Sequence, residues 1–140
     1  MPKSVVVCDF RLWYFCEAIT TMFLATINPK LNLLTMSYGQ HVTPKELQQQ
    51  RPKIEQLLEQ LQPGFCILTD LSGLDRMDYA CAPQIEQVMD LCRRKGVGKV
   101  VRIISDTHKD IRFRVMSYFH YGHDIPITTY ETVAEAMRDL

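Results

Sequence analysis

Three aspartates follow one short apolar run in this sequence, at positions Asp70, Asp75 and Asp78. Grouped carboxylates can bind a divalent cation, although this spacing lacks the alternating order of a calcium-binding loop. Aspartates also cap turns and helix starts, because a carboxylate oxygen accepts hydrogen bonds from nearby backbone amides. The residue types therefore leave two interpretations open, a functional acidic surface and a set of turn caps.

Nucleophilic and metal-ligating residues give weaker signals. Cys81 lies near the predicted start of a helix, which can lower the pKa of a thiol, but no histidine is positioned by the sequence to serve it. We interpret Cys81 as a buried thiol. His120 and His123 lie beside Asp124, but a glycine separates the histidines and no further ligand is specified. With no phosphate-binding glycine loop in the chain, we predict a non-enzymatic protein without a catalytic residue, metal or cofactor.

Composition narrows the class of protein. The chain has 140 residues, enough for one domain, with 46% hydrophobic and 23% charged residues, as in ordinary globular proteins. Lys plus Arg and Asp plus Glu are balanced at 16 each, so no net charge favours nucleic acid or acidic lipid. Five cysteines, an odd number without a Cys-x-x-Cys pair, indicate a reducing compartment. Since no apolar run approaches the ~20 residues that span a bilayer, we expect a cytoplasmic protein without stable membrane insertion.

The first 21 residues fit the general pattern least well. Residues 4–8 are typical of a strand, and residues 12–22 are apolar but interrupted by charge. Clear strand patterns begin only at Met22, so residues 1–21 are either an N-terminal extension with an extra strand or the result of a start assigned too early. If they are native, exposed Trp13 and Phe15 would favour a homodimer.

From Met22 onward, turn and capping residues divide the chain into alternating strands and helices. The capping box formed by Thr43 and Glu46 predicts a helix start, and Pro52 predicts a kink or a break within that helix. Strands are predicted over 23–27, 31–38, 65–71, 99–104 and 125–130, and helices over 44–61, 83–95, 110–121 and 131–140. The proline in the last strand favours an edge position.

The run over 65–71 is apolar on both faces, as required for a central strand that is covered by helices. Asp70 lies near the end of this run, and open α/β sheets present binding sites at the carboxyl ends of their strands. The predicted fold class is therefore α/β, with residues 22–140 forming one domain. Its sheet is mixed or mainly parallel and covered by about four helices.

This order of elements resembles the STAS domain, and most closely its SpoIIAA-like branch of bacterial anti-sigma-factor antagonists. The resemblance covers about residues 22–140. It is carried by Ile67-Leu-Thr-Asp70-Leu-Ser-Gly-Leu-Asp75-Arg-Met-Asp78, which is similar to the family's strand-to-helix segment. Residues 97–104 resemble the next strand of the family, and residues 130–137 its closing helix. The resemblance implies a regulatory domain that acts through protein–protein interaction.

In signalling members of this family, a serine or threonine follows the loop aspartate and is phosphorylated by a partner kinase. Tyr79 occupies that phosphoacceptor position here, so an ordinary serine phosphoswitch would lack its acceptor, and Ser72 is the nearest alternative. The resemblance implies that a protein partner docks on the loop and helix start at 70–82, with residues 105–109 beside it. The implied partner-binding residues are Asp70, Ser72, Asp75, Asp78, Tyr79 and Cys81.

An alternative hypothesis is binding of a small apolar ligand or lipid. SpoIIAA-like proteins also resemble lipid-transfer domains of the CRAL-TRIO type, and this chain is rich in methionine and aromatic residues that can line a pocket. The same side chains can instead fill the core. The sequence specifies neither a ligand nor the identity of a partner.

Overall fold

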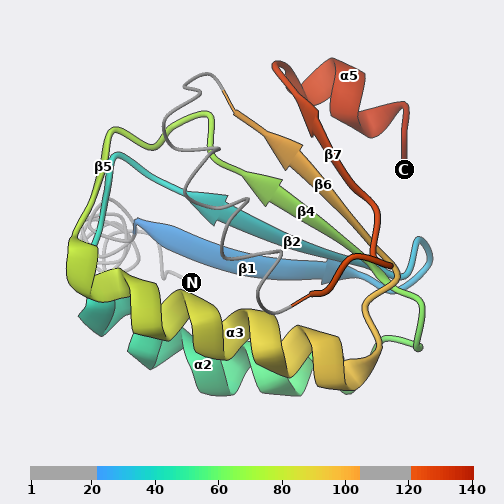
Figure 1. The fold of residues 1–140 in the computed structure, drawn as a ribbon, viewed down its shortest axis with the longest axis horizontal. Coiled ribbons are helices and arrows are strands. Elements are labelled where there is room, and N and C mark those ends of the chain that lie inside the picture. Colours follow the sequence, from blue (N-terminus) through green and yellow to red (C-terminus); the bar gives the residue numbers. More distant parts are fainter. Residues whose placement is uncertain (1–21, 105–120) are drawn as a thin grey trace, which may run out of the picture.

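The structure, a computed structural model, describes residues 22–104 and 121–140, which form a five-stranded sheet with helices packed against it (Figure 1). The sheet order is β1-β2-β4-β6-β7, with β1 antiparallel to β2 and all other neighbours parallel. The strands are β1 (Phe23–Asn28), β2 (Leu33–Tyr38), β4 (Cys66–Asp70), β6 (Lys99–Ile103) and β7 (Ile127–Tyr130). The predicted mixed α/β sheet is confirmed, with the 65–71 run at its centre.

Helix α2 (Pro44–Leu58) begins with the predicted capping box. The Thr43 hydroxyl accepts a hydrogen bond from the Glu46 backbone amide at 3.4 Å. The carboxylate oxygen Oε2 of Glu46 accepts another from the Met22 backbone amide at 2.7 Å. Of the two outcomes expected at Pro52, the break does not occur, because one helix continues through this residue. Burial of Leu47, Ile54 and Leu58 against the sheet offsets the loss of one backbone hydrogen bond.

Helix α3 (Ala82–Lys95) runs beside α2 under the same face of the sheet (Figure 1). It ends where predicted, because Gly96 adopts a φ of 97°, a left-handed conformation that favours glycine. Between these helices and the sheet lies the main core, which includes Phe23, Ile67 and Cys92.

The opposite face of the sheet carries a smaller apolar cluster, with Leu68, Val101 and Ile103 under helix α5 (Val133–Met137). The prediction of a helix over 131–140 is wrong in length. Ala136 is fully buried on the sheet, but after Met137 the chain continues in turns that bring Asp139 to Lys99. The described residues contain three α-helices, and the helix expected over 110–121 falls almost wholly outside them, as does the extension at 1–21.

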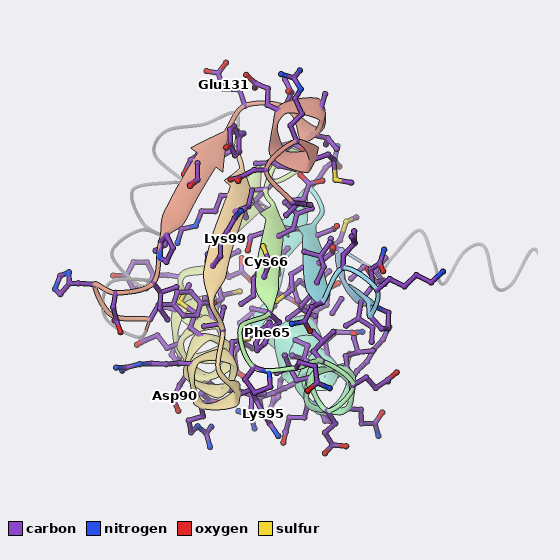
Figure 2. All side chains as sticks on the ribbon, turned by 90° about the vertical axis from the view of Figure 1, so that its right-hand side faces the viewer. Phe65, Cys66, Asp90, Lys95, Lys99 and Glu131 are labelled. Atoms are coloured by element: carbon purple, nitrogen blue, oxygen red, sulfur yellow. The ribbon has the colours of Figure 1, made fainter. Side chains whose placement is uncertain are left out.

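Lys99, Tyr130 and Asp139 form a hydrogen-bonded group, here called the Asp139 cluster. The Lys99 ammonium lies 2.7 Å from one carboxylate oxygen of Asp139, and the Tyr130 hydroxyl donates to the other at 3.0 Å. Lys99 is the first residue of β6 and lies beside Cys66, the first residue of β4 (Figure 2). The cluster therefore fastens the C-terminal residues to the sheet.

Candidate functional site

The predicted site lies where β4 ends and the chain returns to start α3, at the carboxyl end of the parallel strands (Figure 1). Residues 70–80, here called the loop segment, contain strand β5 (Arg76–Met77) and the beginning of a 3-10 turn (Tyr79–Cys81). β5 pairs in parallel with β3 (His41–Val42), and this second, two-stranded sheet was not predicted from the sequence. It fixes the loop segment against the connection between β2 and α2.

Asp70 folds the first turn of the loop segment. One of its carboxylate oxygens accepts from the Ser72 amide at 3.0 Å and from the Ser72 hydroxyl at 2.6 Å. These are the bonds of an aspartate that caps a turn, so the turn-cap interpretation applies to Asp70. Neither side chain is buried, and Ser72 is exposed.

Asp78 is held by a histidine that the sequence interpretation missed. His41 Nε2 lies 2.8 Å from Asp78 Oδ1, and Arg76 Nη2 lies 3.3 Å from His41 Nδ1. Because a guanidinium can only donate, Nδ1 must accept from Arg76, which assigns the ring proton to Nε2 and directs it to Asp78. The register of β3 with β5 places His41 opposite Arg76, and nothing in the sequence indicated that these distant residues meet.

Tyr79 and Asp75 are the outward-facing members of the predicted site. The side chain of Tyr79 is 84% exposed, the largest exposure among the exposed large apolar side chains of the described residues. Asp75 is exposed, and its backbone amide donates to the Gln40 carbonyl at 2.9 Å. The backbone here is therefore held in place, while the carboxylate and the phenol point to solvent.

Cys81 has a different position from the other predicted residues. It is fully buried, and its thiol donates to the Val42 carbonyl at 3.3 Å. Burial raises the pKa of the Cys81 thiol to about 11, so the neutral form predominates at physiological pH. Cys81 is thus a core residue that offers neither a nucleophile nor a contact surface.

Comparison with known proteins identifies the fold. No protein-family model matches the sequence, and no curated protein matches it. An uncharacterized protein of the DUF3478 family from Shewanella loihica PV-4, described as having a SpoIIAA-like fold, superposes with a TM-score of 0.64 at 18% identity over 84% of this chain and 91% of that one. This chain has a SpoIIAA-like fold.

Two structures of SpoIIAA itself are also similar. The unphosphorylated anti-sigma factor antagonist gives a TM-score of 0.57 at 15% identity, covering 84% of this chain and 96% of that one. The phosphorylated Bacillus cell fate determinant gives 0.54 at 16% identity, covering 84% of this chain and 97% of that one. At these identities the likeness establishes the shared fold, which confirms the resemblance drawn from the sequence.

The described residues line a small cavity between the sheet and α3 that bears on the alternative of an apolar ligand. Its volume of about 10 Å³ is room for about one water molecule. The lining residues are Met36, Tyr38, Thr69, Ile85, Val88, Met89, Val100, Arg102 and Tyr121. Because the methionines in this lining pack in the core, this cavity does not favour the ligand hypothesis.

Residues 22–104 and 121–140 contain no group of three or more His, Cys, Asp or Glu side chains that could hold a metal ion. In the same residues, no helix is both long and apolar enough to cross a membrane. Residues 105–109, which we expected beside the site, lie outside the described residues.

Proposed function

We propose that this protein is a non-enzymatic regulatory domain that binds a protein partner through the loop segment. The observation that carries the proposal is the exposed Tyr79, placed on a fixed backbone at the start of α3. Tyrosine is enriched among residues that dominate binding energy, because it buries a large area at a small cost in side-chain entropy. A phenol that is 84% exposed in the isolated chain has that area available.

The neighbours of Tyr79 support the same function. Asp75 adds an exposed carboxylate, and Asp78 and Arg76 are aligned by His41 rather than left to move independently. A preorganised surface loses less conformational entropy when a partner binds. The loop segment therefore combines an aromatic side chain with oriented charges, as expected at the centre of a modest protein–protein interface.

A serine phosphoswitch is not part of the proposal. SpoIIAA, which shares the fold, is known in unphosphorylated and phosphorylated forms. In this chain Tyr79 takes the acceptor position suggested by the resemblance, and the hydroxyl of Ser72 is already bound to Asp70 at 2.6 Å. A phosphate on Ser72 would add about −1.5 to −2 charge beside that carboxylate, which is unfavourable.

Quantitative affinity capture from the host tests this proposal. Wild-type protein and the variants Tyr79→Ala and Asp75→Arg would be compared by mass spectrometry of the retained proteins. Glu59→Arg is a matched charge reversal at the far end of α2, where Glu59 is also exposed. We expect one protein that is retained by wild type and Glu59→Arg and lost from both loop variants.

Thermal unfolding of the same samples provides the control for folding, because the side chains of Tyr79 and Asp75 are exposed and their replacement should leave Tm unchanged. Retention of the same proteins by all four samples would refute docking through the loop segment.

A further inference from the structure

The two edges of the sheet differ in how they are protected from pairing with another strand. β7 has four residues, follows Pro126 and is packed against α5. β1 has six residues, FLATIN, with no charged residue, no proline and no bulge in its register with β2. Natural proteins use such charges, prolines and bulges to block unwanted pairing at sheet edges. None of the described residues pairs with the outer edge of β1.

The side chains of β1 alternate strictly between the two faces of the sheet. Phe23 and Ala25 are 2% and 0% exposed and face the helices, while Leu24 is 48% exposed on the opposite face. Thr26 and Asn28 are exposed on the same side as Leu24. This pattern specifies which residues a new neighbouring strand must place on each face.

We propose that β1 pairs antiparallel with β1 of a second copy of this chain, in a register centred on Ala25. Opposing residues in an antiparallel pair lie on the same face, so a helix-facing residue must meet a helix-facing residue. Centring on Ala25 sets Phe23 against Ile27 of the second copy and Leu24 against Thr26 of the second copy. The helix-facing apolar side chains then continue across the two-fold axis, and the contact is isologous and closed.

Two neighbouring registers also keep the faces matched. The register centred on Thr26 would set Leu24 against Asn28 and would bring Pro29, which has no amide hydrogen, opposite Phe23. The register centred on Leu24 would pair only Phe23–Ala25 of each β1, whereas the register centred on Ala25 pairs Phe23–Ile27. The register centred on Ala25 avoids these mismatches and gives the longer ladder. The pairing uses no residue of the loop segment, so the inference does not rest on the proposed docking function.

Sedimentation of the full-length chain across a concentration series tests this inference. We expect the wild type to sediment as a monomer–dimer equilibrium. Leu24→Lys combined with Thr26→Lys sets like charges directly opposite each other and should abolish the dimer. Leu24→Lys combined with Thr26→Glu sets opposite charges against each other and should retain it. Both double variants replace Leu24 with lysine and differ only in the charge at position 26. A difference in their dimerisation therefore reports which residues oppose each other in the pair of strands.

Circular dichroism would verify that both double variants are folded, since the altered side chains are exposed. Val133→Lys, a change at another exposed apolar residue, should leave the dimer intact. A wild type that is monomeric at every concentration would overturn the inference. The inference would also be overturned if the variant with Leu24→Lys and Thr26→Lys still dimerises, or if both double variants are monomeric.

Discussion

The loop segment and the Asp139 cluster each contain an aspartate, a tyrosine and a basic side chain. In the Asp139 cluster, the carboxylate of Asp139 accepts from both Lys99 and Tyr130, so the three side chains are bonded to one another within the fold. In the loop segment, Asp78 is bound by His41, while the adjacent Tyr79 is 84% exposed.

This difference shows how the same residue types serve structure in one place and are available for binding in another. In the Asp139 cluster, the three side chains fasten a five-residue helix that is too short to be stable alone. In the loop segment, two short strands already fix the backbone, so Tyr79 and Asp75 are not needed for folding. Substitutions in the two regions should therefore have opposite effects on binding and on stability.

The largest expected effect is on partner binding. Tyr79→Ala should weaken binding of the captured partner by about 2 kcal/mol, roughly 30-fold, because the exposed ring is the main apolar contact. Tyr130→Ala should leave the affinity unchanged and lower Tm instead. Calorimetric titration together with thermal unfolding of both variants checks this reciprocal pattern. A loss of affinity in Tyr130→Ala without loss of stability would contradict it.

The next effect is on stability. Asp139→Ala should lower Tm and speed amide exchange over Val133–Met137, because the change removes the carboxylate that accepts from Lys99 and Tyr130 and leaves Lys99 bonded only to the backbone carbonyl of residue 139. Asp75→Ala should change neither quantity. Hydrogen exchange followed by mass spectrometry compares the two variants directly. If α5 exchanges equally in Asp139→Ala and wild type, the Asp139 cluster does not hold the C-terminal residues.

A smaller effect concerns pH. Hydrogen bonds from Lys99 and Tyr130 lower the pKa of Asp139, and their bonds to Asp139 raise the pKa values of Lys99 and Tyr130. The contribution of ionised Asp139 to folding stability is present above its unfolded pKa of about 3.9. It is lost as pH falls through the lower pKa of the folded state. The contributions of protonated Tyr130 and Lys99 to folding stability are present below their unfolded pKa values of about 10 and 10.4. They are lost as pH rises through the higher pKa values of the folded state.

The stability difference between wild type and Asp139→Asn should therefore be largest between about pH 5 and pH 9 and should shrink on either side of that window. Urea unfolding of both proteins across pH measures it. A difference that does not vary with pH would mean that the ion pair contributes nothing.

The smallest effect is expected at His41. Its ring and the Asp78 carboxylate are both partly exposed to solvent, at 35% and 44%, so the pair is screened. His41→Gln should change the free energy of unfolding by about 0.5 kcal/mol or less. It should nevertheless weaken partner binding, because Asp78 and Arg76 lose their alignment. Unchanged affinity would show that the orientation of these charges is unimportant.

Much of the fold could be predicted because its signals are local. The apolar run before Asp70, the capping box at Thr43 and the glycine at Gly96 each specify an element through a few neighbouring residues. A break at Pro52 did not occur, because packing of α2 against the sheet overrode the local signal. The last helix was predicted too long, because the Asp139 cluster overrode the local signal there.

The site was predicted as a segment and not as an arrangement. Asp70, Asp75, Asp78 and Tyr79 could be grouped because they follow one strand, but their different environments depend on contacts outside that segment. His41 could not be found, since the two strands that align it with Arg76 have two residues each and carry no periodic pattern. The burial of Cys81 matches the interpretation of its thiol and removes it from the proposed surface.

Hydrogen exchange of the protein alone and bound to its captured partner tests the central claim most directly. Docking through the loop segment predicts that the partner slows exchange at residues 70–82 and leaves Val133–Met137 unchanged. Protection confined to α5 or to β1, with none at residues 70–82, would contradict the proposed function.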